Sequence, residues 1–172
     1  RMIIKDKVDS LFIGDDYLTC EYTKQPIKES EVKSWRDKGY YHESFTGGLY
    51  SSRNTMPRWT KDISDSIGLD NCGYTFYKME TLDIMPPHFD HFDTYSRIFN
   101  INKDKVFRAI VFLEDWKPGH YFEYNKIGNT TWSKGEYVMY SHDIEHAASN
   151  IGIEPRYTLQ ITGTIYKHIN FK

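Results

Sequence analysis

His88 and Asp90 are the residues whose types and spacing most clearly suggest chemistry. They lie two residues apart in the segment MPPHFDHFD, so both side chains share one face if the chain is extended. His146, in the later segment SHDIEHAASNIG, could supply a third ligand from another strand. Two histidines and one carboxylate on one face of an octahedron leave three positions open, as in non-haem iron(II) sites. These three residues form the first candidate metal site.

A second pair of the same type, His91 and Asp93, begins three residues after His88. In an extended chain it points to the opposite face, so only one of the two pairs can belong to the site. The Pro86-Pro87 dipeptide restricts the backbone directly before His88. This restriction favours the first pair.

The third ligand also has an alternative, because His142 lies in the same segment as His146. Only His146 directly precedes two small residues, Ala147 and Ala148, which would leave room for a bound ligand. The chain has seven histidines, and each of them taken alone could be structural. Their order together with Arg156 on the next predicted strand is what favours a metal site at His146.

The segment RYTLQITGT predicts a strand with one polar and one apolar face. The polar face carries Arg156, Thr158, Gln160 and Thr162. The apolar face carries Tyr157, Leu159 and Ile161. Beside a metal, Arg156 could bind a carboxylate at two points while the Thr158 hydroxyl donates a further hydrogen bond. At the edge of an ordinary sandwich the same face would only meet water, and the residues alone leave both interpretations open.

Short segments rich in β-branched and aromatic residues predict the strands that must position these side chains. They are 74–84, 106–113, 121–124, 130–132, 137–140, 146–150 and 157–166. Turn residues such as Gly128-Asn129 separate them, with no helical pattern between, which predicts an antiparallel sandwich or barrel. The segment VFRAIVFLED is apolar on both faces apart from Arg108, which predicts a central strand and a half-buried charge that needs a partner.

The front of the chain contains two predicted helices. Ser30 could cap the first, which runs through Trp35 and stops at Gly39. The second follows Pro57, carries an apolar residue at every fourth position and ends at Gly68.

Residues 40–54 have two adjacent glycines and no helical period, which is typical of an exposed loop or loose hairpin and of a lid over a binding site. The whole chain, 1–172, is expected to form one domain. In this division 1–72 holds the helices and the lid, and 73–172 holds the sheet core.

Composition and charge argue against several classes of protein. The net charge is -2 and the basic residues are scattered, so no stripe for nucleic acid is formed. No apolar stretch approaches the roughly 18 residues of a membrane span, and the N-terminal residues lack a signal-peptide pattern. Cys20 and Cys72 belong to no metal motif and suit a reducing compartment. We therefore expect a soluble, cytoplasmic protein that binds neither nucleic acid nor membrane.

Residues 83–164 resemble the 2-oxoglutarate/iron(II) dioxygenase superfamily, in particular its small prolyl-hydroxylase-like enzymes of marine bacteria and their phages. The resemblance rests on DIMPPHFD, FRAIVFLEDWKPGHYFEY, WSKGEYVMYSHDIEHAASNIG and RYTLQITGT. It implies a mainly β fold, a double-stranded β-helix (jelly roll) with N-terminal helices. The HxD…H motif implies that His88, Asp90 and His146 bind iron(II) at the catalytic centre. A phage protein would act in the cytoplasm of its host.

The same resemblance implies contacts to the cosubstrate. An arginine about ten residues after the second histidine binds the distal carboxylate of 2-oxoglutarate in this superfamily, and that position is Arg156. Thr158, Tyr77 and Tyr74 are candidates for further contacts. The side chains expected to flank the substrate pocket are Trp116, His120, Tyr95 and Arg97.

The implied reaction couples oxidative decarboxylation of 2-oxoglutarate to succinate and CO2 with hydroxylation of a peptide residue, amino acid or small metabolite. The partners would be 2-oxoglutarate, dioxygen and that substrate. Asp90 favours hydroxylation, because related halogenases have a small residue at its position. Two other functions fit the pattern. One is a metal-binding cupin-like jelly roll, an isomerase or binding module that does not use 2-oxoglutarate, and the other is a non-catalytic domain with structural histidines.

Overall fold

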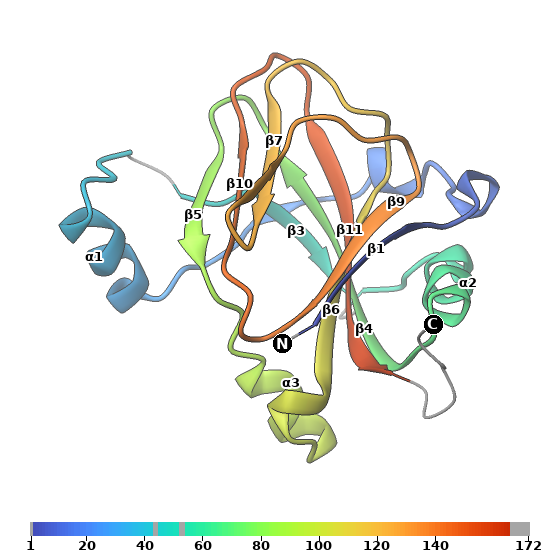
Figure 1. Ribbon diagram of the computed structural model, residues 1–172. Helices are drawn as coiled ribbons and strands as arrows, with labels where there is room; N and C mark the ends of the chain where they lie inside the picture. The colour runs from blue at the N-terminus through green and yellow to red at the C-terminus, as the bar shows by residue number, and fades with distance from the viewer. Residues whose placement is uncertain (1, 43–44, 52–53, 166–172) are drawn as a thin grey trace.

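The computed structural model describes residues 2–42, 45–51 and 54–165, which form two antiparallel β-sheets with helices around them (Figure 1). The larger sheet has the strand order β1-β9-β6-β11-β4-β3-β2. These strands are, in the same order, Ile3–Lys7, Glu136–Ser141, Val106–Phe112, Arg156–Ile165, Leu69–Met79, Gly48–Ser51 and Thr23–Lys24. The smaller sheet has the order β5-β10-β7-β8, formed by Ile84–His88, His146–Asn150, His120–Tyr124 and Ile127–Asn129. The predicted mainly β fold, a double-stranded β-helix, is confirmed.

The helices lie at the periphery of the sheets (Figure 1). The α-helices are α1, α2 and α3, at Glu29–Asp37, Arg58–Ser66 and Asp93–Phe99. Three short 3-10 helices, η1 to η3, span Ser10–Phe12, Asp16–Leu18 and Lys103–Lys105. None of the helices in the described ranges is long and apolar enough to cross a membrane.

Strand β11 has the two faces that its sequence predicts. Leu159 and Ile161 are fully buried in a core on the outer face of the larger sheet, where Ile63 of α2 also packs. Burying one such aliphatic side chain contributes about 1.5–3 kcal/mol. Thr158 and Gln160 point the other way and line a cavity between the sheets. The outer core therefore stabilises the strand whose inner face carries the polar residues.

A second core fills much of the space between the two sheets. Its buried members are Ile110, Phe112, Phe122, Tyr124, Trp132, Val138, Tyr140 and Ile144. Three of them, Ile110 on β6, Phe122 on β7 and Tyr140 on β9, also line the polar cavity. The apolar packing and the cavity thus share side chains, which holds the walls of the cavity in place.

Helix α1 fastens strand β5 to the rest of the molecule. The buried indole of Trp35 donates a hydrogen bond from its Nε1 to the Pro87 carbonyl oxygen at 3.2 Å. The helix begins at Glu29 after Lys28, so the predicted cap at Ser30 is wrong. Its end before Gly39 is as predicted, because that residue has a φ of +96°.

Helix α2 follows the sequence pattern closely. It begins directly after Pro57, whose restricted φ suits the start of a helix. It ends ahead of Gly68, which has a φ of +76° and so adopts a conformation that favours glycine.

The predicted strand 74–84 is wrong, because the chain forms two strands there, β4 and β5, with a turn between them. In this turn Leu82 has a φ of +71°. The Asp83 carboxylate accepts a hydrogen bond from the backbone N–H of Glu80 at 2.7 Å and stabilises the turn. Because the turn contains neither glycine nor proline, the apolar pattern appeared to continue through it.

The predicted strand 130–132 is also wrong. Strand β8 ends at Asn129, because the hairpin from β7 turns at Asn125 and Lys126 rather than at Gly128-Asn129. Asn125 and Lys126 have φ values of +49° and +65°, as a tight hairpin turn with two left-handed residues requires.

The segment 40–54 differs from the predicted exposed loop over residues 45–51. Phe45 and Thr46 are buried, and β3 pairs with β4. Residues 43–44 and 52–53 of the predicted lid lie outside the described residues. The sequence pattern also missed β1, β2 and α3.

Candidate metal centre

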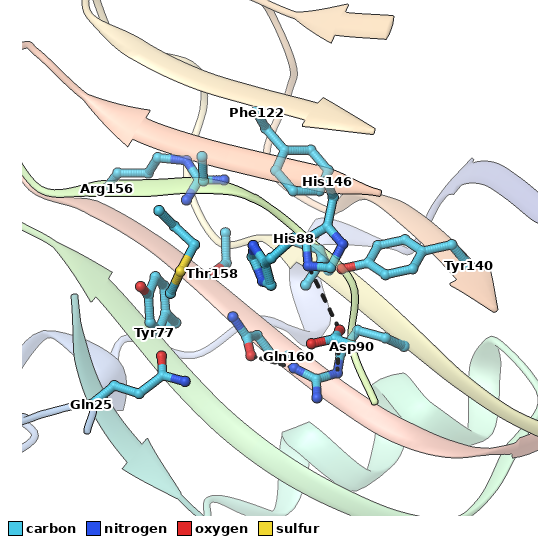
Figure 2. Close-up of a pocket in the computed structure, with 14 residues that line it drawn as sticks. Gln25, Tyr77, His88, Asp90, Phe122, Tyr140, His146, Arg156, Thr158 and Gln160 are labelled. Atoms are coloured by element: carbon cyan, nitrogen blue, oxygen red, sulfur yellow. Dashed lines mark hydrogen bonds and ion pairs between the residues drawn. The ribbon is translucent and has the colours of Figure 1, made fainter. Parts of the chain in front are cut away.

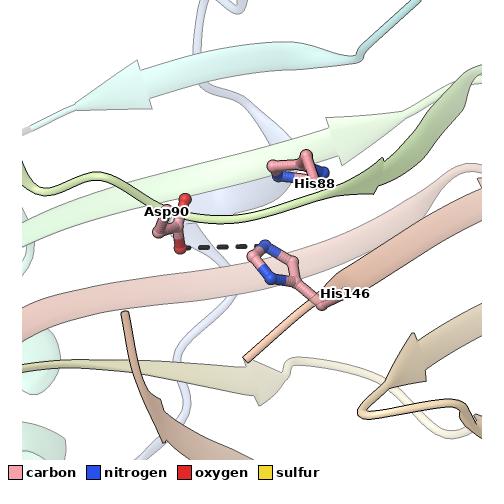
Figure 3. A group of neighbouring side chains, drawn as sticks. All are labelled: His88, Asp90 and His146. Carbon is pink, nitrogen blue, oxygen red and sulfur yellow. Dashed lines mark ion pairs between the residues drawn. The ribbon is translucent and has the colours of Figure 1, made fainter. Parts of the chain in front are cut away.

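His88, Asp90 and His146 come together at one end of the smaller sheet (Figure 3). His88 ends β5, His146 begins β10, and the two residues are direct partners in the pairing of these strands. One ligand atom from each of the three residues lies within 4.8 Å of the other two. This group could therefore hold a metal ion.

Both histidines present the same nitrogen to the centre of the group. His88 Nδ1 lies 2.8 Å from the Pro86 carbonyl oxygen, and His146 Nδ1 lies 3.2 Å from the Ile144 carbonyl oxygen. A carbonyl oxygen only accepts, so each Nδ1 carries the proton and each Nε2 keeps a lone pair. Backbone groups thus hold both rings in the tautomer that binds a metal through Nε2.

The charges of the group also favour metal binding. Burial lowers the pKa of His146 to about 4, so its imidazole is neutral at neutral pH. Burial by itself would raise the pKa of Asp90, but Arg108, followed by His146 and His88, outweighs this effect and lowers it. A neutral imidazole and an ionised carboxylate are the forms that bind metal.

The structure distinguishes the two HxD pairs and the two late histidines. His91 and Asp93 are exposed and stand outside the group, because α3 begins at Asp93 and takes the chain out of the extended conformation. His142 Nε2 pairs with an Asp104 carboxylate oxygen at 2.8 Å, also outside the group.

Arg108 is the half-buried charge for which the sequence predicted a partner, and it has two. Its Nη1 donates a hydrogen bond to Gln160 Oε1 at 2.6 Å. Its Nε lies 3.7 Å from Asp90 Oδ2. The same carboxylate oxygen lies 3.7 Å from His146 Nε2. Arg108 therefore compensates the charge of Asp90.

The group opens into the cavity between the sheets (Figure 2). The cavity is lined by Gln25, Tyr77, Met85, His88, Asp90, Arg108, Ile110, Phe122, Tyr140, His146, Ala148, Arg156, Thr158 and Gln160. Ala148 is thus one of the small residues that make room beside His146, as the sequence suggested.

Arg156 lies in the wall of this cavity and is 2% exposed. Its Nη1 reaches only the Met79 sulfur, at 3.4 Å, and its Nε and Nη2 have no hydrogen-bond partner among the described residues. Burial lowers the pKa of Arg156 to about 10, so the guanidinium stays charged at neutral pH. A buried charge without an anion is costly. The cavity could therefore hold a negatively charged group.

Three aromatic rings hold the guanidinium in place. Its Cζ lies 5.7 Å from the ring centres of Phe112 and Phe122 and 5.5 Å from that of Trp132. Phe112 and Trp132 stack on each other with centroids 4.1 Å apart. Attraction to the rings recovers part of the cost of burial but supplies no hydrogen-bond acceptor.

The other predicted contacts to the cosubstrate divide into two groups. Thr158 and Tyr77 line the cavity, while Tyr74 lies outside it and shares a hydrogen bond with the Ser64 hydroxyl at 2.8 Å. The Tyr77 hydroxyl accepts a hydrogen bond from the Gly47 backbone N–H at 2.7 Å and shares another with Thr46 at 2.9 Å.

The side chains expected to flank the pocket do not line it. Trp116 and His120 lie behind the wall, since the Trp116 indole donates to the His120 carbonyl oxygen and the His120 ring stacks near Trp132. Tyr95 on α3 donates its hydroxyl to the Asn71 carbonyl oxygen, and Arg97 is exposed.

Sequence reasoning missed Tyr140 and Gln25 as lining residues. In EYVMYS, simple alternation puts Tyr140 on the same face as Val138, and its position shortly before SHDIEH could have indicated closeness to the metal ligands. Gln25 carries no such signal. Its side chain lines the cavity, where its Oε1 accepts a hydrogen bond from the Thr46 hydroxyl at 2.9 Å.

Comparison with known proteins supports the fold. The sequence matches no known family model and no curated protein. The structure is similar to that of a Pseudomonas putida prolyl-4-hydroxylase, with a TM-score of 0.54 and 15% identity over 88% of this chain and 96% of that one. The structure of a non-heme monooxygenase, ThoJ, in complex with nickel is similar with a TM-score of 0.48 and 12% identity, over 68% of this chain and 57% of that one. A cupin protein from Bacteroides fragilis has a TM-score of 0.43 and 9% identity, covering 90% and 93%.

Proposed function

We propose that this protein is an iron(II)- and 2-oxoglutarate-dependent oxygenase that hydroxylates a carbon of its substrate. The observation that carries the proposal is the buried, unpartnered guanidinium of Arg156 in the same cavity as His88, Asp90 and His146. A metal site by itself needs no such arginine. A cosubstrate that both chelates a metal and carries a distal carboxylate needs both features.

The residues present fit iron(II). Two imidazoles and one carboxylate on one side of an ion leave positions open for a chelating ligand and for dioxygen. Asp90 Oδ2 is buried and has no hydrogen-bond partner among the described residues, as expected for an atom whose partner is an ion.

The residues at the other end fit the distal carboxylate of 2-oxoglutarate. The free Nε and Nη2 of Arg156 form one edge of the guanidinium, which matches the two oxygens of a carboxylate. Thr158 is buried beside it in the cavity wall and offers a hydroxyl. The carboxylate would neutralise the buried charge, which is the source of the binding energy.

When bound, iron(II) and 2-oxoglutarate supply the oxidation, in which dioxygen is consumed, succinate and CO2 are released and a substrate C–H bond becomes C–OH. The contributions of the protein are structural and electrostatic. The carbonyls of Pro86 and Ile144 hold the two imidazoles in one tautomer, and Arg108 keeps Asp90 ionised. The apolar walls at Ile110 and Phe122 exclude water from the reacting groups.

Anaerobic titration tests the proposal. Protein loaded with iron(II) is titrated with 2-oxoglutarate while the metal-to-ligand charge-transfer band is followed, and succinate is then measured after oxygen is admitted. A saturable band and succinate formation, both lost on chelation of the iron, are the expected results. A protein that binds iron but gives neither is a cupin-like metal protein, and one that binds no metal has structural histidines.

A further inference from the structure

Tyr140 is a buried tyrosine whose hydroxyl is left unpaired by the described residues. The side chain is 0% exposed, and its hydroxyl has no hydrogen-bond partner among the described residues. A buried hydroxyl without a partner costs on the order of 1–3 kcal/mol, so such groups are rare. The same cavity contains the unpartnered atoms of Arg156 and Asp90, for which the proposed ligands account.

The strand register places Tyr140 at the metal end of the cavity. Tyr140 on β9 is paired with Arg108 on β6, which is paired in turn with Thr162 on β11. Arg156 lies six residues before Thr162 on the same face of β11, far along the sheet. Figure 2 shows Arg156 and Tyr140 on opposite sides of the histidine ligands.

Contacts of the ring agree with this placement. The ring centroid of Tyr140 lies 4.8 Å from that of His146, and the two rings are inclined at 41°. The hydroxyl end of the side chain faces the histidines and Asp90 in Figure 2. A group bound to the metal on this side would meet the phenol directly.

The other tyrosine of the cavity differs from Tyr140. The Tyr77 hydroxyl already has two hydrogen bonds, to Gly47 and Thr46. Since Thr46 donates its own proton to Gln25, the Tyr77 proton is directed to Thr46. Tyr140 is therefore the one phenol in the described lining of the cavity with a free donor.

We propose that Tyr140 donates its phenolic O–H to an oxygen at the metal-chelating end of 2-oxoglutarate, the 1-carboxylate and 2-oxo group. This inference rests on the proposed function and adds a second recognition point to it. Arg156 binds the distal carboxylate, and Tyr140 binds the chelating end. Together the two residues recognise both ends of a 2-oxo dicarboxylic acid.

The test uses Tyr140→Phe, which removes the hydroxyl and preserves the ring. Tyr137→Phe is the matched control, because Tyr137 is buried on the same strand but packs in the outer core. Each iron-loaded protein is titrated anaerobically with 2-oxoglutarate and with pyruvate, a 2-oxo acid that lacks the distal carboxylate. Iron(II) affinity is measured separately, and circular dichroism checks the fold.

Loss of a hydrogen bond to a charged group predicts that Tyr140→Phe binds both 2-oxo acids about tenfold more weakly, with a shifted charge-transfer band. Iron affinity should be unchanged, and Tyr137→Phe should behave as wild type. Arg156→Ala should weaken binding of 2-oxoglutarate but not of pyruvate.

Wild-type affinities and band in Tyr140→Phe would overturn this inference alone. So would a fall in iron affinity without a change in 2-oxo acid affinity, since the phenol would then serve Asp90. No band in the wild type would overturn the proposed function and this inference with it.

Discussion

The two ends of the cavity are organised in opposite ways. At the metal end, Asp90 has Arg108 and His146 within 3.7 Å, and backbone carbonyls hold both histidine rings. At the arginine end, the guanidinium of Arg156 lies against aromatic rings and the Met79 sulfur, and its Nε and Nη2 have no hydrogen-bond partner among the described residues. One end is balanced in charge before any ligand arrives, and the other is not.

This difference indicates two kinds of binding site. The metal end has its candidate ligand atoms oriented in advance, so an ion could enter with little rearrangement of the protein. The arginine end retains an uncompensated charge, so an anion gains the energy that the protein lost by burying it. Variants at the two ends should therefore affect different ligands and change stability in opposite directions.

The largest effect is expected when a ligand is removed at the metal end. His88→Ala or His146→Ala should weaken iron(II) or manganese(II) binding by more than the roughly 10–100-fold that loss of an outer-shell partner costs. The fold should persist, because the two cores do not depend on the ion. Metal titration by calorimetry, with circular dichroism for the fold, measures both. His91→Ala is the control and should bind metal as the wild type does; tight binding in both ligand variants would refute the assignment.

At the arginine end, Arg156→Ala should weaken 2-oxoglutarate binding by roughly thirty-fold or more, since it leaves a carboxylate unpaired at a cost of about 2–5 kcal/mol. Arg156→Lys should recover only part of this, because an ammonium cannot make the planar two-point contact. Iron affinity should change little. Arg97→Ala, which removes an exposed arginine, is the matched control in the charge-transfer titration. Equal affinity of the Arg156→Ala and Arg97→Ala proteins would rule out the clamp.

In the ligand-free protein, variants at the two ends of the cavity should change the free energy of unfolding in opposite directions. Arg156→Met removes an unpaired buried charge and should raise the free energy of unfolding by about 1–4 kcal/mol. Arg108→Met leaves Asp90 without its partner and should lower it by about 1–3 kcal/mol. Urea unfolding of the metal-free variants measures both values. A loss of stability in both variants would mean that the arginine end is compensated in some other way.

The smallest effect concerns His120, which stacks near Trp132 at the arginine end. Burial, together with Arg156, lowers the pKa of His120 although its bond to the Glu154 carbonyl opposes the shift. The unfolded chain therefore takes up a proton first as the pH falls below about 6.5, and stability is lost until the folded-state pKa is reached. His120→Gln should lose less stability than wild type over this interval in urea unfolding at a series of pH values. A pH dependence in His120→Gln identical to that of the wild type would show that His120 does not contribute.

Local pattern was enough to predict much of the sheet. Strand β10 has the predicted bounds, and β11 has its polar and apolar faces as expected, because alternation along one strand is a property of neighbouring residues. The pattern failed at β1 and β3, which are short and join the sheet through partners far away in the chain. It failed again between β4 and β5, where the turn depends on the Asp83 side chain rather than on glycine or proline.

The sequence by itself determined which chemistry was possible, through two histidines, a carboxylate and an arginine at or next to predicted strands. Only the tertiary structure decided which HxD pair lies beside His146, because α3 begins at Asp93 and leaves the first pair facing the cavity. It also decided that His146 lies opposite His88 and that Arg156 meets no anion among the described residues. Spacing along a strand is set by covalent geometry. Which distant strands pair is set by the register in which their apolar faces pack, and the sequence of one strand does not specify its partners.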